Sequence, residues 1–145
     1  MKRHQRFFVT ALILVGAFAL GGCETRLADP EAVTAVRVVW FPAHNLRRSP
    51  LDIEVDPNLV GLFIDRLNLS QRFDAIWNIT DTPLYEGRYE ITVYKKAGGK
   101  DFYQLGGESV LYAPATKTYY QNKDLLLFVY ENLFLELIKR KITIP

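Results

Sequence analysis

The chain has 145 residues, with 18 Lys and Arg, 16 Asp and Glu, and one cysteine. Three of the bases lie in the first six residues, so the rest of the chain carries 15 bases against 16 acids, a net charge near −1. Without a basic excess, the electrostatic footprint of a nucleic-acid-binding protein is missing. A single cysteine leaves no intrachain disulfide, so a domain must be stabilised by its hydrophobic core alone.

The first 23 residues have the pattern of a bacterial export signal. Three bases at positions 2–6 precede an uncharged, mostly apolar run over 7–20, which is shorter than the roughly 20 residues of a transmembrane helix. Residues 20–23 read Leu-Gly-Gly-Cys and resemble the lipobox of bacterial lipoproteins. That resemblance implies cleavage before Cys23 and attachment of lipid, palmitate included, to its thiol and new amino group. An ordinary signal peptide followed by a chance cysteine is the alternative.

These features divide the chain into three parts. We expect a signal peptide over 1–22, the lipidated cysteine and a tether over 23–32, and a single domain over 33–145. The tether is predicted from a polar stretch that contains a proline and has no periodicity. Two or more acyl chains anchor a protein stably to a membrane. Glu24 stands where enteric bacteria use aspartate as an inner-membrane retention signal, so by resemblance to that sorting rule we expect the outer membrane, facing the periplasm.

The first predicted elements of the domain are a strand and a helix. Apolar residues at every second position predict a strand over 33–42, and a loop is expected over 43–55. Asp56 and Pro57 are residue types preferred at the N-cap and first position of a helix, which we expect to end near Ser70.

Three further strands are expected over 73–80, 88–93 and 102–113. Paired glycines at 98 and 99 predict a hairpin turn, since tight turns require positive φ, and those at 106 and 107 predict a bulge or bend within the last strand. Asp124 is expected to cap a final helix over 125–141, which ends in three bases where the helix dipole favours cations.

The predicted order is therefore strand, helix, three strands, helix. The simplest arrangement is an α+β fold in which two helices pack on one face of a four-stranded mixed sheet. If its first two strands are parallel neighbours, the helical crossover between them should be right-handed. The large residues expected to be buried together in the core are Trp40, Phe63, Trp77, Ile91 and Phe134.

The sequence contains little that predicts catalysis. His44 is the only histidine after the signal, and no motif for an activated serine occurs, so we expect a non-enzymatic protein without a cofactor. Asp52, Glu54 and Asp56 alternate along an extended segment and could bind calcium. The spacing of a dedicated calcium loop is missing, so a solvated acidic edge without a metal is the preferred interpretation. A small-ligand or metal-binding lipoprotein remains the alternative.

Two features point to binding instead. The final helix is apolar over more than half of its circumference, wider than the stripe of about 100° that packing on a sheet requires. Either a partner protein covers residues such as Phe128 and Leu135, or the other helix and the loops bury them. Lys95, Lys96 and Lys100 surround the glycine turn. They either keep the turn soluble or bind the phosphate groups of lipid head groups.

A short lipoprotein with this element order resembles the lipopolysaccharide-assembly lipoprotein family. The resemblance rests on Cys23, on the order of elements, on the strand over 85–91, and on residues 120–123 leading into a long final helix. It implies an accessory or plug subunit of an outer-membrane assembly, with an outer-membrane protein as partner and lipopolysaccharide as candidate ligand. No residue can be matched to that family's lipopolysaccharide contacts. Accessory lipoproteins of other transport or secretion systems have a similar order.

Replacing the lipidation candidate gives the first test. We expect Cys23→Ser to leave the membrane fraction, or to keep its signal peptide, because serine offers no thiol for acylation. Membrane fractionation with mass spectrometry of the intact chain measures both effects. A Cys23→Ser protein that stays membrane-bound at the mature mass would contradict the lipoprotein interpretation.

Overall fold

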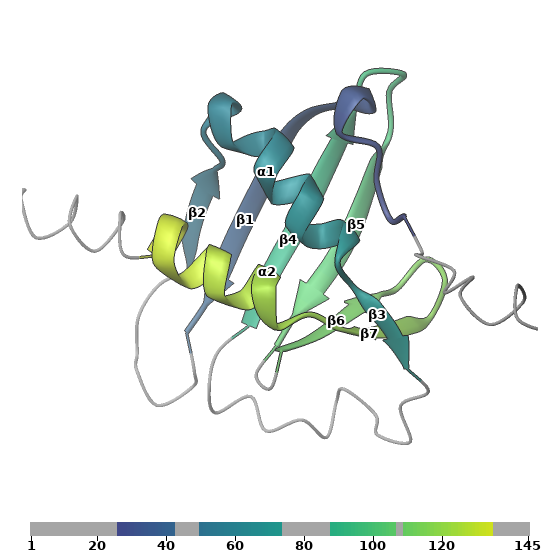
Figure 1. Cartoon of the computed structure of the whole chain (residues 1–145). Coiled ribbons are helices and arrows are strands. Elements are labelled where there is room, and N and C mark those ends of the chain that lie inside the picture. The colour runs from purple at the N-terminus through teal and green to yellow at the C-terminus, as the bar shows by residue number, and fades with distance from the viewer. Residues whose placement is uncertain (1–25, 43–49, 74–87, 107–108, 135–145) are drawn as a thin grey trace, which may run out of the picture.

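The computed structural model describes residues 26–42, 50–73, 88–106 and 109–134. In these ranges the chain forms one seven-stranded sheet, and both α-helices lie on the same face of it (Figure 1). The strand order is β2-β1-β4-β5-β6-β7-β3, and every neighbouring pair is antiparallel.

The strands are β1 (Val33–Phe41), β2 (Leu51–Glu54), β3 (Gln71–Phe73), β4 (Arg88–Lys95), β5 (Lys100–Leu105), β6 (Val110–Ala113) and β7 (Thr118–Gln121). The helices are α1 (Pro57–Asn68) and α2 (Lys123–Phe128), with a short 3₁₀ helix at Pro30–Ala32 and a π-helix at Val129–Phe134.

The expected four-stranded mixed sheet is wrong. The segment expected as a loop contains β2, in which half-buried Leu51 and Ile53 alternate with exposed acids and which pairs with β1. The strand that follows α1 is β3, which pairs with β7 at the opposite edge of the sheet from β1 and β2, so the strands on either side of α1 are not parallel neighbours and the conditional crossover does not occur. At the far edge, β3 covers only the first position of the strand expected over 73–80, whose other residues lie outside the described ranges.

The single strand expected over 102–113 is also wrong, because the chain folds back on itself as β5 and β6. The Gly106 N–H donates to the Val110 carbonyl (2.9 Å) and Ser109 adopts φ 65°, so β5 and β6 run antiparallel where a bulge or bend within one strand was expected. A second turn, with Lys117 at φ 52°, leads into β7, which was not predicted at all.

The start of α1 is as predicted. Pro57 is its first residue, and the Asp56 carboxylate accepts a hydrogen bond from the Asn58 N–H at 2.9 Å. The buried face of α1, which packs over the sheet, consists of Val60, Phe63, Ile64 and Leu67.

The start of the final helix differs from the prediction. Asn122, not Asp124, is its N-cap: the amide oxygen of Asn122 accepts from the Leu125 N–H at 2.8 Å. After Phe128 the hydrogen bonding widens into the π-helix, and the rest of the helix expected to run to residue 141 lies outside the described residues.

One apolar layer fills the space between the sheet and the helices. The predicted burial of Trp40, Phe63 and Ile91 is confirmed, with exposed fractions of 7%, 0% and 0%. The register of β1 and β4 brings their core residues together on one face of the sheet, because Trp40 lies opposite Tyr89 and Val38 lies opposite Ile91. The side chains of Trp77 and Phe134 lie outside the described set.

Asn122 joins the two helices through this layer. Its side chain is 3% exposed, and its amide nitrogen donates to the Arg66 carbonyl at 2.9 Å and lies 2.7 Å from the Ser70 hydroxyl oxygen. The same side chain caps α2, while its backbone N–H donates to the Ser109 carbonyl at 2.8 Å. One residue thus satisfies polar groups at the end of α1, at the start of α2 and in the turn before β6.

Substitution of Asn122 separates these roles. Asn122→Ala should lower the free energy of unfolding by about 2–4 kcal/mol, because it removes a helix cap together with the hydrogen bonds from the Asn122 amide to the Arg66 carbonyl and the Ser70 hydroxyl. Serine caps a helix about as well as asparagine but lacks the amide donors. The free energy of unfolding of Asn122→Ser should therefore fall by about 1 kcal/mol less than that of Asn122→Ala. Urea unfolding measures both. A serine variant as stable as the parent would show that the bond to α1 contributes nothing.

Candidate functional site

The sequence-predicted partner residues do not form one exposed surface. Phe128 is buried at 7% exposure and packs edge-to-face on Phe63, with ring centroids 6.0 Å apart. In this structure Phe128 is therefore a core residue and is not available to a partner. Leu135 and Cys23 lie outside the described residues. Among the described side chains of α2 and the π-helix, the large apolar ones that are exposed are Leu127 (55%) and Tyr130 (48%).

The predicted hairpin turn between β4 and β5 is confirmed. Gly98 and Gly99 have φ values of 83° and 84°, a region that favours glycine because it has no Cβ. The turn closes through the Gly98 N–H, which donates to the Lys95 carbonyl at 3.1 Å.

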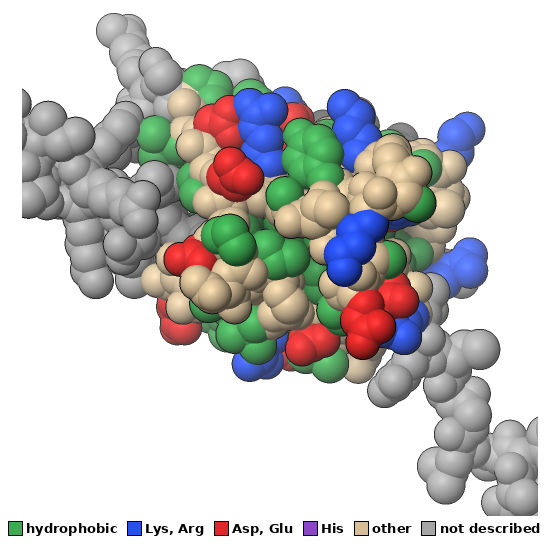
Figure 2. Space-filling view, turned by 90° about the horizontal axis from the view of Figure 1, so that it is seen from above, with side chains coloured by type: hydrophobic (Ala, Val, Ile, Leu, Met, Phe, Trp, Pro, Cys, Tyr) green, Lys and Arg blue, Asp and Glu red, His purple; other side chains and the backbone are tan. Residues whose placement is uncertain are grey.

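The three lysines of this turn are exposed but do not form a purely cationic tip. Lys95 pairs with Asp101, with Nζ 2.8 Å from the carboxylate oxygen. No ion pair joins Lys96 or Lys100 to another described residue. Seen from the hairpin end, bases and acids lie side by side with hydrophobic side chains between them (Figure 2). Neither the Lys96 nor the Lys100 ammonium group would have to leave an ion pair with a described residue in order to contact a phosphate group.

The acidic edge has structural partners. Two nitrogens of the Arg37 guanidinium donate to the two carboxylate oxygens of Asp52, across β1 and β2. This hydrogen-bonded pair lowers the pKa of Asp52 and raises that of Arg37. Asp56 is engaged as the cap of α1, which leaves Glu54 as the one carboxylate of the three that pairs with no other described residue. Within the described ranges, no group of three or more His, Cys, Asp or Glu side chains could hold a metal ion.

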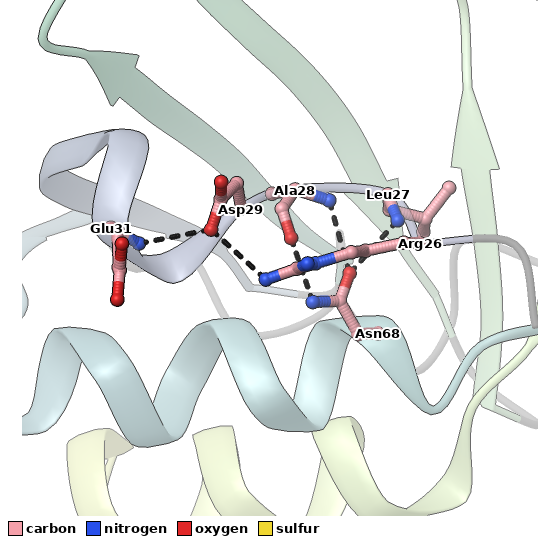
Figure 3. Close-up of polar contacts among 6 residues, drawn as sticks. All are labelled: Arg26, Leu27, Ala28, Asp29, Glu31 and Asn68. Atoms are coloured by element: carbon pink, nitrogen blue, oxygen red, sulfur yellow. Dashed lines mark hydrogen bonds and ion pairs between the residues drawn. The ribbon is translucent and has the colours of Figure 1, made fainter.

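A contact that the sequence did not predict lies at the other end of α1. The amide oxygen of Asn68 accepts from the N–H groups of Leu27 (2.8 Å) and Ala28 (3.0 Å), and its amide nitrogen donates to the Ala28 carbonyl (2.7 Å) (Figure 3). We call these three bonds the Asn68 clamp. The amide of asparagine matches a peptide backbone because it carries a donor and an acceptor side by side.

The clamp fixes residues 26–32, which we call the N-terminal strap. Asp29 caps the 3₁₀ helix by accepting from the Glu31 N–H at 3.2 Å, and it pairs with Arg26 at 2.9 Å (Figure 3). At the end of the strap, the Ala32 carbonyl accepts from the Lys96 N–H at 2.8 Å. The chain expected as a free tether up to residue 32 is thus packed on the domain from about Leu27 onward.

The strap covers part of the sheet beside α1. Ala28 is 8% exposed, and the Tyr103 hydroxyl from β5 lies 3.4 Å from the Leu27 carbonyl oxygen. Burial is the main cause that raises the pKa of Tyr103 to about 12, so this hydroxyl stays protonated and can donate at neutral pH. The strap, α1 and α2 together cover the core face of the sheet.

No family model, curated protein or solved structure matches this chain. None of the helices in the described ranges is long and apolar enough to span a membrane. The sequence signal for the clamp was weak, because Asn68 stands out only as part of an Asn-Leu-Ser triplet that matches a glycosylation pattern.

The hairpin lysines can be tested apart from the fold. A triple change of Lys95, Lys96 and Lys100 to glutamine should leave the melting temperature nearly unchanged, because exposed ion pairs such as Lys95–Asp101 contribute at most about 1 kcal/mol. Binding to purified lipopolysaccharide should weaken and lose part of its salt dependence. Lys117→Gln, at the turn before β7, is the matched control. A triple variant that binds as the parent does at low and high salt would show that the lysines only keep the turn soluble.

Proposed function

We propose that this protein is a lipid-anchored accessory subunit of a bacterial outer-membrane assembly and carries out no chemistry of its own. The observation that supports this best is the closeness of the folded domain to the lipidation candidate. Packing against the domain begins near Leu27, only four residues after Cys23. An anchored domain with so short a connection works at the membrane surface rather than at a distance from it.

The roles of the polar side chains favour binding over catalysis. Asp52 is paired with Arg37, Asp56 caps α1, and the buried Asn122 joins two helices. Each of these groups has a structural role that a reacting group would have to give up. Within the described part of the helical face, large apolar side chains remain exposed at Leu62 (43%), Leu69 (50%), Leu127 (55%) and Tyr130 (48%).

The outer-membrane assembly to test first is the one that transports lipopolysaccharide. The element order behind that resemblance differs from the order in the structure, so its support now comes from the lipobox-like sequence and the exposed lysines of the β4–β5 turn. Lys96 and Lys100 are available to phosphate groups on a ligand. A metal-binding lipoprotein is the second candidate, and it has less support because Asp52 and Asp56 are engaged elsewhere.

Purification from detergent-solubilised membranes tests this proposal. We expect the full chain to be retained with a much larger outer-membrane protein, visible as a stoichiometric band and as a high-mass peak on gel filtration. Cys23→Ser serves as the control, because without the anchor the protein should be recovered at lower yield in that complex. A monomeric protein that retains calcium through gel filtration would instead support the second candidate.

A further inference from the structure

The Asn68 clamp limits how far the domain can stand from its anchor. Extended chain spans at most about 3.6 Å per residue, so the four steps from Cys23 to Leu27 reach about 14 Å. With the clamp open, packing would begin at β1, and the ten steps from Cys23 to Val33 would reach about 35 Å. A closed clamp therefore keeps the end of α1 that carries Asn68 close to the anchored cysteine.

The surface around the clamp suits a lipid surface. Leu69, the residue after Asn68, exposes half of its side chain, and Leu27 is only half-buried. Arg72 on β3 is exposed close by in the chain, and the Arg26 side chain is 63% exposed within its surface ion pair with Asp29. Apolar side chains beside cationic ones give the combination of buried area and electrostatic attraction by which proteins bind anionic membranes.

We propose that this surface, formed by Arg26, Leu69 and Arg72 around the Asn68 clamp, is the face of the domain that rests on the lipid head groups. The inference rests on the proposed function, because it requires lipid on Cys23. It adds an orientation: the end of α1 that carries Asn68 faces the membrane, and Leu127, which lies near the end of α2 away from Asn122 and α1, stays open to a protein partner.

Site-specific labelling tests the orientation. Cys23 is the only cysteine of the chain and would be blocked by acylation, so Leu69→Cys and Leu127→Cys each supply a single reactive thiol. The two leucines have similar exposed fractions, 50% and 55%, which makes them a matched pair. The full lipidated chain carries an environment-sensitive fluorophore at either position, in vesicles of phosphatidylethanolamine with a minority of phosphatidylglycerol.

We expect a lipid-borne quencher to quench the label at position 69 severalfold more than the label at position 127, and iodide in the water to show the reverse order. Adding Asn68→Ala should remove most of the lipid quenching at position 69 while the protein stays on the vesicles. Equal quenching at both positions, stronger quenching at 127, or no effect of Asn68→Ala would overturn the proposed orientation.

If the lipid anchor that the proposed function requires does not exist, the experiment gives a different result. A chain without lipid on Cys23 would have an unmodified mass and would not float with the vesicles, before any quenching is measured. A lipidated chain whose label at position 69 is shielded from iodide but not quenched from the lipid would show that a protein contact occupies this surface, which also overturns the proposal.

Discussion

The end of α1 is the point on which the rest of the structure depends, because the last carbonyls of a helix have no donors within the helix. Here the backbone N–H groups of Leu69 and Ser70 donate to the Arg66 and Leu67 carbonyls, each at 3.2 Å, and two side chains add further bonds. The Asn122 amide donates to the Arg66 carbonyl, and the Ser70 hydroxyl donates to the Leu67 carbonyl at 2.6 Å. Because Asn122 is buried, leaving its amide unpaired would cost about 1–3 kcal/mol. The pairing of this amide with the end of α1 therefore fixes where α2 begins.

The same turn of α1 also fixes the N-terminal strap. Asn68 and Asn122 both use the side-chain amide as donor and acceptor at once. Asn68 donates to and accepts from the strap, whereas Asn122 donates to α1 and accepts from α2. An aspartate at either position could accept but not donate at neutral pH. The covering layer of the sheet thus consists of three segments that are distant in the chain and meet at one helix end.

Local patterns predicted the parts of the fold that depend on neighbouring residues. The Asp56–Pro57 helix start, the glycine turn and the burial of Trp40 each follow from a short stretch of sequence. The number of strands does not, because β2 and β7 have only four residues each and become strands by pairing with β1 and β6. The same applies to the site. The position of the lysine turn could be predicted, but the clamp joins Leu27 to Asn68 across 41 positions and has no local pattern.

The order of strand pairing has a consequence for when this protein can fold. β1 finds its principal partner, β4, only after a strand, a helix and a further strand have intervened, and β3 pairs with the last strand, β7. Sheets whose paired strands are distant in the sequence fold slowly, because the entropy of closing the intervening loop is lost before the stabilising contacts form. During synthesis, β1 therefore lacks its main partner until β4 has been made, and the sheet is complete only once β7 has followed.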